Sequence, residues 1–149
     1  GAVDLYLGFD LLRSAEPENL KYASPQRSQA LVSTAEIANA AMNRNPLTER
    51  FPASDRLRQA IDDCTGKDNI YLDTYWLAEC LFADTLYANM LLLGAAYQAG
   101  ALPLKAESIE RAIERSKRPI EVRAIGFERS KSIVTKKSKR PCVPLTRWS

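Results

Sequence analysis

The sequence predicts an α/β protein built on a parallel sheet, and three observations carry this prediction. Short apolar segments alternate with stretches of helical periodicity, in the order strand, helix, strand, helix, strand, helix. A length of 149 residues suits one domain with a sizeable core. Residues 85–104 contain no charged residue, although 26% of the chain is charged, so they predict a buried helix for that core.

The uncharged segment has the periodicity of a core helix. One face carries Leu86, Met90, Leu93 and Tyr97, with Leu91, Leu92 and Ala96 on the flanks. Gly100 suits the position just past the helix end, and Pro103 prevents its continuation. A membrane-spanning helix is the alternative, because the window is about 20 residues long. Since Asn89, Gly94 and Gln98 interrupt it, we favour a core helix of a soluble protein with no membrane contact. The odd number of widely spaced cysteines fits a reducing cytoplasm, so we expect a cytoplasmic protein.

The other elements follow from local patterns. We expect strands over residues 3–9, 30–34 and 70–73, with Leu5, Leu7 and Phe9 sharing one face. Short helical turns, broken at Pro17, fill residues 10–22, and a polar connection spans 38–52. Ser54 is the expected N-cap of a helix to residue 64. Further helices are expected over residues 75–83 and 105–117, and residues 120–134 could form another. The expected inward residues are Leu57, Ala60, Ile61, Cys64, Trp76, Leu77, Cys80, Leu81, Ile109, Ala112 and Ile113.

Three strands are few for a parallel sheet, because both of its faces need covering. The first strand also begins almost at residue 1. We therefore predict a partial Rossmann-like, three-layer domain over residues 1–117 that lacks its N-terminal half, followed by a basic extension over residues 118–149. The alternative is that another chain supplies the missing strands.

The composition argues against several kinds of catalytic and metal-binding site. The chain has no histidine, the commonest general base and metal ligand. Its three cysteines are widely spaced without a CxxC pair, so we expect neither a disulfide framework nor a cysteine-bound metal. Cys142 is the thiol that we expect to react. No metal ligand and no catalytic residue is predicted.

Charge is distributed unevenly along the chain. There are 9 basic and 15 acidic residues before Arg111, and 12 basic and 3 acidic from there on. The basic cluster of Lys131, Lys136, Lys137, Lys139 and Arg140 could follow nucleic-acid phosphates. Because only Trp148 offers a stacking surface nearby, we favour a solvated tail and do not expect nucleic acid as a partner.

A few polar residues are candidates for an interface or a ligand site. Ser33 and Thr34 end a parallel strand, where open α/β sheets place ligand crevices; the alternative is a hydroxyl bonded to nearby backbone. Asp73 is expected to cap the next helix. Asn89 either faces a neighbouring domain or bonds to backbone at residues 73–75, and we favour the second hypothesis.

Part of the sequence resembles a known family. Residues 89–94 (Asn-Met-Leu-Leu-Leu-Gly), residues 102–104 (Leu-Pro-Leu) and residues 107–114 closely resemble the C-terminal part of the gamma domain of 2-oxoacid:ferredoxin oxidoreductases. Residues 4–10 and 29–37 resemble the strand–Gly-x-Asp and strand–Asn-Thr-x-x-Ile patterns of that domain. The similarity covers residues 2–114 and is greatest to the fused bacterial indolepyruvate ferredoxin oxidoreductases.

The resemblance implies an accessory domain. Family enzymes oxidise a 2-oxoacid with coenzyme A, which makes coenzyme A a candidate substrate, and pass the electrons to ferredoxin. Their thiamine diphosphate, Mg²⁺ and iron–sulfur clusters are expected on other domains, and none on this chain. The expected partners are those domains, ferredoxin through the full enzyme, and further copies of the chain.

Two departures from the family pattern bear on this implication. The Gly-x-Gly-Gly-Gln-Gly turn that opens the family's gamma domain is absent from the sequence, and Lys105 replaces a helix-capping Ser or Thr. The competing hypothesis is a non-enzymatic interaction module whose basic tail binds nucleic acid or an acidic protein.

Overall fold

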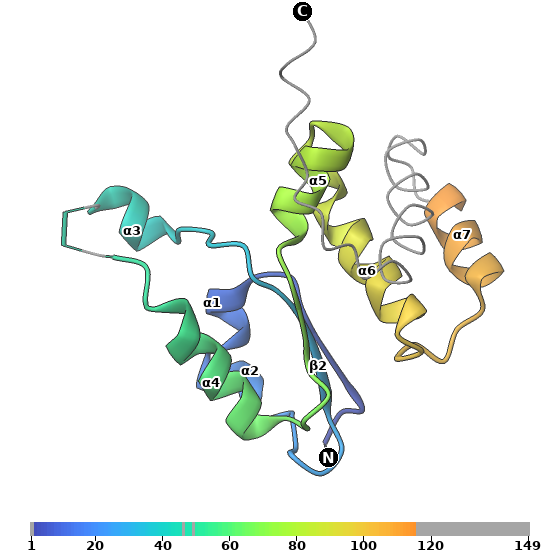
Figure 1. Cartoon of the computed structure of the whole chain (residues 1–149), viewed down its shortest axis with the longest axis horizontal. Helices are drawn as coiled ribbons and strands as arrows, with labels where there is room; N and C mark the ends of the chain where they lie inside the picture. The colour runs from blue at the N-terminus through green and yellow to red at the C-terminus, as the bar shows by residue number, and fades with distance from the viewer. Residues whose placement is uncertain (1, 46, 49, 116–149) are drawn as a thin grey trace, which may run out of the picture. The chain divides into compact units, whose positions relative to one another are not determined.

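The computed structural model describes residues 2–45, 47–48 and 50–115 (Figure 1). The chain divides into two compact units, Gly1–Leu72 and Asp73–Ser149, and each is considered by itself. Five predictions fall outside the described residues: the basic extension over 118–149, the helix over 120–134, the basic cluster, the reactive Cys142 and the stacking Trp148.

The first unit is a parallel sheet with crossover helices. Its elements are β1 (Leu5–Gly8), α1 (Leu11–Ser14), α2 (Pro17–Leu20), β2 (Gln29–Ser33), α3 (Ala40–Arg44), α4 (Ser54–Cys64) and β3 (Ile70–Leu72). The strand order is β1-β2-β3, and both pairs are parallel. Leu5 pairs with Gln29, and Leu31 pairs with Ile70. The predicted α/β class, with a partial Rossmann-like parallel sheet, is confirmed.

The core of this unit lies between the sheet and three helices. Leu11 of α1, Leu20 of α2 and Ile61 of α4 pack against one another. Ala30 and Val32 of β2 belong to the same buried cluster. Because alternate strand residues share a face, one side of the sheet carries α1, α2 and α4 together (Figure 1). The predicted inner face of α4 is confirmed, since Leu57, Ala60 and Cys64 pack onto this cluster.

Three expectations for the first unit are wrong. The polar connection contains α3, whose N-cap Asn39 accepts hydrogen bonds from the amides of Ala41 and Met42. The short helix buries Met42, an apolar anchor within an otherwise polar segment. Ser54 is not the N-cap of α4, because Ala53 takes that position and the Ser54 hydroxyl donates to Glu36. Phe9 lies beyond β1 and is 40% exposed.

The second unit is helical among its described residues. It contains α5 (Thr74–Phe82), a 3₁₀ turn η1 (Thr85–Tyr87), α6 (Ala88–Gln98) and α7 (Ala106–Arg115). Ala78, Ala88 and Leu91 form the buried contact between α5 and α6. On another face of α6, Met90, Leu93 and Tyr97 pack against the two buried isoleucines of α7. The α6 helix is thus apolar on two sides because it packs on two neighbours.

Both ends of α5 and the end of α6 follow known capping chemistry. The Asp73 carboxylate accepts from the Trp76 amide at 2.9 Å, which confirms Asp73 as a helix cap. Ala83 ends α5 in the left-handed conformation, with φ of 54°. Gly100, with φ of 72°, ends α6: its amide bonds to the Tyr97 carbonyl, and the Ala101 amide bonds to the Ala96 carbonyl. This is a Schellman motif, and it confirms the predicted stop at Gly100.

In the second unit, some residues that were predicted to face the core are exposed. Leu86 is 74% exposed, because η1 rather than α6 contains it. Trp76 is 46% exposed, and Ala112 lies on the exposed side of α7. Within the described part of the chain, every helix is too short or too polar to cross a lipid bilayer.

Candidate functional site

At the carboxyl edge of the sheet, Ser33 and Thr34 were candidates for a ligand crevice, with a hydroxyl bonded to nearby backbone as the alternative. Ser33 is fully buried, and its Oγ accepts a long hydrogen bond of 3.5 Å from the Ala35 amide. The Thr34 amide donates to the Leu72 carbonyl at 2.9 Å and so continues the strand ladder. For Ser33, the hydroxyl–backbone alternative therefore describes the structure better than the crevice hypothesis.

The same edge shows why β1 ends in Gly-x-Asp. A Cβ atom placed on Gly8 would lie 2.1 Å from Ser14 Oγ and 3.1 Å from Val32 Cγ1, so only glycine fits there. Asp10 caps α1 by accepting from the Arg13 amide, and the Ser14 hydroxyl donates to the Asp10 carbonyl at 2.6 Å. Tyr6 completes the contact by donating its hydroxyl to the Ser14 carbonyl at 2.8 Å. This motif fastens α1 onto β1 and leaves no room for a ligand at Gly8.

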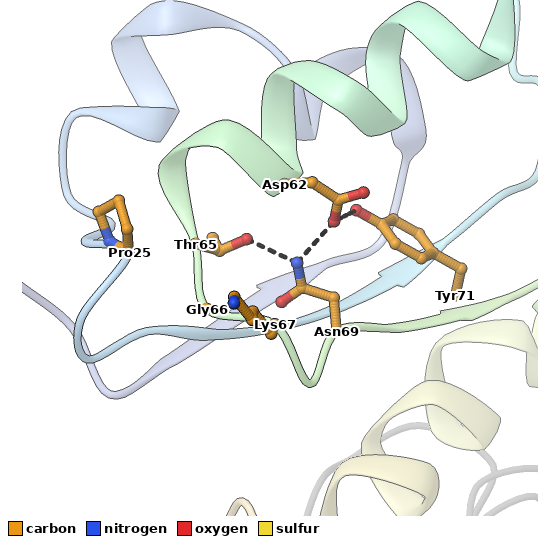
Figure 2. A pocket seen from close by; sticks show the side chains of 7 residues that line it. All are labelled: Pro25, Asp62, Thr65, Gly66, Lys67, Asn69 and Tyr71. Carbon is orange, nitrogen blue, oxygen red and sulfur yellow. Dashed lines mark hydrogen bonds between the residues drawn. The ribbon is translucent and has the colours of Figure 1, made fainter.

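A polar cleft lies at the opposite, amino edge of the sheet (Figure 2). It has a volume of about 450 Å³ and is open to solvent. Its walls come from the last turn of α4, the loop before β3, Tyr71 of β3 and the turn before β2. The lining residues are Pro25, Asp62, Thr65, Gly66, Lys67, Asn69 and Tyr71.

Hydrogen bonds hold the polar side chains of the cleft in place. The Asp62 Oδ1 atom accepts from Asn69 Nδ2 at 2.6 Å and from the Tyr71 hydroxyl at 2.7 Å, as Figure 2 shows. Asn69 Nδ2 also donates to Thr65 Oγ1 at 2.8 Å. The Thr65 hydroxyl in turn donates to the Ile61 carbonyl at 2.7 Å. The Asp62 carboxylate therefore has a fixed orientation.

Asn69 also joins the cleft to the sheet. Its Oδ1 atom accepts from the amide of the fully buried Ala30 at 2.8 Å. Nearby, Gln29 Nε2 donates to the Asp68 carbonyl at 2.7 Å, and the Gly66 amide donates to the Ser28 carbonyl at 2.7 Å. The loop before β3 thus occupies the place of a strand partner for the start of β2.

The electrostatics of the cleft centre on Tyr71. Partial burial raises the pKa of the Tyr71 hydroxyl above its ordinary value of 10.0, and the hydrogen bond to the Asp62 carboxylate raises this pKa further. The Arg58 guanidinium lies 5.4 Å from the ring centroid of Tyr71 and opposes this shift. Arg58 Nε is buried without a hydrogen-bond partner. The phenol is consequently a hydrogen-bond donor to Asp62 at neutral pH.

Sequence reasoning missed this cleft. Asp62, Asn69 and Tyr71 were not among the candidates for a functional site. The available signal was weak: a Thr-Gly-Lys-Asp-Asn turn, typical of a loop, followed by a tyrosine near the start of a strand. Nothing in the spacing shows that Asn69 reaches the Ala30 amide, 39 positions earlier in the chain.

Asn89 belongs to the second unit and lies on the exposed side of α6. The favoured hypothesis, a buried amide bonded to backbone at residues 73–75, is therefore wrong. Asn89 is exposed because the packing of α6 buries Ala88, Leu91 and Leu92 and leaves position 89 facing solvent. Asp73, which caps α5, is also exposed.

The described residues contain no cluster of three or more Cys, Asp or Glu side chains that could hold a metal ion. The cleft supplies one fixed carboxylate, one phenol, one amide and the flexible Lys67 ammonium, a set suited to binding. No protein-family model, curated protein or solved structure matches the chain.

Proposed function

We propose that the chain is the C-terminal part of a gamma-type accessory domain in a ferredoxin-linked, thiamine diphosphate-dependent 2-oxoacid oxidoreductase of the indolepyruvate type. In this proposal the chain packs against the catalytic domains and does not catalyse by itself. Thiamine diphosphate, Mg²⁺ and the iron–sulfur clusters are bound elsewhere in the enzyme. Coenzyme A is a substrate, and ferredoxin is reached only through the full assembly.

The observation that carries the proposal is the pairing of the sheet. Among the described residues, β1 and β3 each pair with β2 alone. The Asp4 carbonyl accepts from the Gln29 amide, so the alternate residues Leu5 and Leu7 direct their backbone groups away from β2. By the same alternation, Tyr71 directs its backbone groups away from β2, because the Leu72 carbonyl accepts from Thr34. Parallel sheets bury their strands, and open edges pair readily with further strands.

The second unit also supports a partner-dependent domain. Leu86 and Trp76 are large apolar side chains that remain exposed, and Asn89 is exposed in the segment that most resembles the oxidoreductase family. Exposed apolar side chains of this kind are common in protein interfaces. The rival function, an interaction module with a basic tail, depends on residues outside the described part of the chain, and no described contact favours it.

An affinity-tagged copy of the chain, expressed in its own cell, tests the proposal. We expect it to purify with thiamine diphosphate and with an activity that reduces ferredoxin when a 2-oxoacid and coenzyme A are added. The DNA upstream of the Gly1 codon should encode Gly-x-Gly-Gly-Gln-Gly. Purification without the cofactor and without 2-oxoacid oxidation, together with no such upstream segment, would contradict the proposal.

The variant Asn89→Leu tests the interface within that assembly. Because Asn89 is exposed, the melting temperature of the isolated chain should be nearly unchanged. The unfolding free energy should change by no more than about 0.5 kcal/mol. The variant should recover less of the thiamine diphosphate enzyme in the same purification. Asn43→Leu is the matched control, since Asn43 is an exposed helical asparagine of the first unit. If both variants recovered equal amounts of the thiamine diphosphate enzyme, Asn89 would not be part of the interface.

A further inference from the structure

The cleft at the amino edge of the sheet contains two ionic side chains of opposite charge that are not paired with each other. Among the described residues the ion pairs join Arg13 to Glu16 and Arg27 to Asp4. Asp62 and Lys67 both line the cleft, yet no nitrogen–oxygen distance between them falls within 4.0 Å. A carboxylate and an ammonium group therefore line one open cleft without being paired with each other.

The carboxylate is oriented before any ligand arrives. Both neighbouring donors, Asn69 Nδ2 and the Tyr71 hydroxyl, bond to the same atom, Asp62 Oδ1. Asp62 Oδ2 has no hydrogen bond to a described residue and remains available as an acceptor. A fixed acceptor binds a cationic donor with a smaller loss of conformational freedom than a mobile one. Arg58 does not fulfil this role, because its guanidinium lies over the Tyr71 ring.

The rest of the lining suits a small organic molecule. Pro25 and the ring of Tyr71 provide apolar surface within the lining. The volume of about 450 Å³ lies within the range of small-molecule sites. A metal ion fits less well, because Asp62 is the only carboxylate among the lining residues. An anion alone would be repelled by Asp62, and a cation alone by Lys67.

We propose that this cleft binds a small zwitterion of the free α-amino acid class. The ligand's ammonium group donates to Asp62 Oδ2, its carboxylate accepts from Lys67 Nζ, and its side chain lies along Pro25 and Tyr71. All of the residues that form this site belong to the first unit. A bound ligand links the end of α4 to the loop before β3 and so stabilises the folded unit.

Nuclear magnetic resonance of the full chain tests the site with named probes. Glycine, leucine and phenylalanine are titrated into ¹⁵N-labelled protein, with methylammonium and acetate as single-charge probes. We expect an amino acid to shift the Gly66 amide and the Asn69 side-chain amide, with saturation in the millimolar range. Each single-charge probe should need a concentration at least about tenfold higher, since it forms only one of the two ionic contacts.

Two variants locate the contacts. Asp62→Asn keeps an acceptor oxygen for Tyr71 and Asn69 but removes the charge, and Lys67→Gln removes the ammonium without touching the hydrogen-bond network. Each should weaken amino-acid binding by about tenfold or more. Asp63→Asn is the matched control, because Asp63 bonds to Gln59 and does not line the cleft. Lys67→Gln also serves if Asp62→Asn fails to fold.

Three results would overturn the proposal. The first is the absence of shifts at Gly66 and Asn69 with any of the three amino acids at tens of millimolar. The second is that acetate or methylammonium alone binds as tightly as the amino acids. The third is that Lys67→Gln binds as well as the unaltered chain. A positive result in the isolated chain would stand even if no oxidoreductase co-purified with it, so the two proposals fail separately.

Discussion

The two units of this chain are stabilised in different ways. In the first unit, side chains bond to backbone or side chains far away in sequence: Asn69 with Ala30, Gln29 with Asp68, and Ser28 with Val3. In the second unit, the caps at Asp73 and Asp84 are local, because each carboxylate accepts from an amide two or three residues later. The contacts described above between α5 and α6 and between α6 and α7 are clusters of apolar side chains.

The two units differ because their backbone groups find hydrogen-bond partners in different ways. A parallel sheet with short strands leaves backbone groups at its ends that need partners, and buried groups without one are costly. Helices satisfy their backbone groups internally and need only caps and an apolar face. A sheet unit is therefore more sensitive to the loss of single polar side chains, and a helical unit is sensitive mainly to the loss of apolar volume.

The largest expected effects come from core truncation, which should be similar in both units. Ile61→Ala removes a fully buried side chain of the first unit, and Leu91→Ala removes a side chain of the second unit that is 2% exposed. Each should lower the unfolding free energy by about 2–5 kcal/mol. Hydrogen exchange measured along the chain should increase mainly in the unit that carries the substitution. Equal increases in both units for either variant would show that they unfold as one.

The next effect should separate the units. Asn69→Ala leaves the buried Ala30 amide without its acceptor and should lower the unfolding free energy by about 1–3 kcal/mol. Urea unfolding of the full chain measures this change. Asn43→Ala is the control, because Asn43 is exposed and on a short helix. A loss no larger than that of the control would mean that the link between the loop and β2 contributes little.

The smallest effect concerns pH. Because the folded state raises the pKa of Tyr71, its protonated hydroxyl adds stability that is fully present below the ordinary tyrosine pKa of 10.0. That contribution is lost progressively as the pH rises above this value. Tyr71→Phe should therefore be less stable than the parent by about 1 kcal/mol near neutral pH, and the difference should shrink in alkaline solution.

Urea unfolding at neutral pH and above pH 10 measures that difference. Tyr22→Phe, at an exposed position, is the control and should follow the parent at every pH. If the gap between Tyr71→Phe and the parent stayed constant across this range, the bond to Asp62 would not depend on the phenol proton.

Sequence reasoning was most accurate where a local pattern determines the structure. The α4 inner face, the Asp73 cap and the Gly100 stop were all predicted, because periodicity and capping chemistry act within a few residues. The predictions from sequence were wrong where the exposure of a side chain depends on which other element packs against it. The exposure of Asn89 depends on which sides of α6 are covered, and the positions of Leu86 and Trp76 depend on the turn between α5 and α6.

The cleft illustrates the same limit for sites. Asp62, Asn69 and Tyr71 come together only because the chain ends α4, turns and enters β3 beside β2. The candidates Ser33 and Thr34 were placed correctly at a strand end, but the burial of Ser33 follows from packing that its neighbours in sequence do not reveal. A pattern can thus identify a strand end without showing whether it is open.

The central position of β2 has a consequence for how the chain folds. Among the strands that the structure describes, β2 has a partner on each side. It pairs with residues remote in sequence, Leu5 with Gln29 on one side and Leu31 with Ile70 on the other. Neither pairing can form until a long loop has closed, and loop closure before contact makes non-local sheets slow to assemble. The helices of the second unit meet through shorter connections. We therefore expect α5 and α6 to become protected from hydrogen exchange before β2 does during refolding.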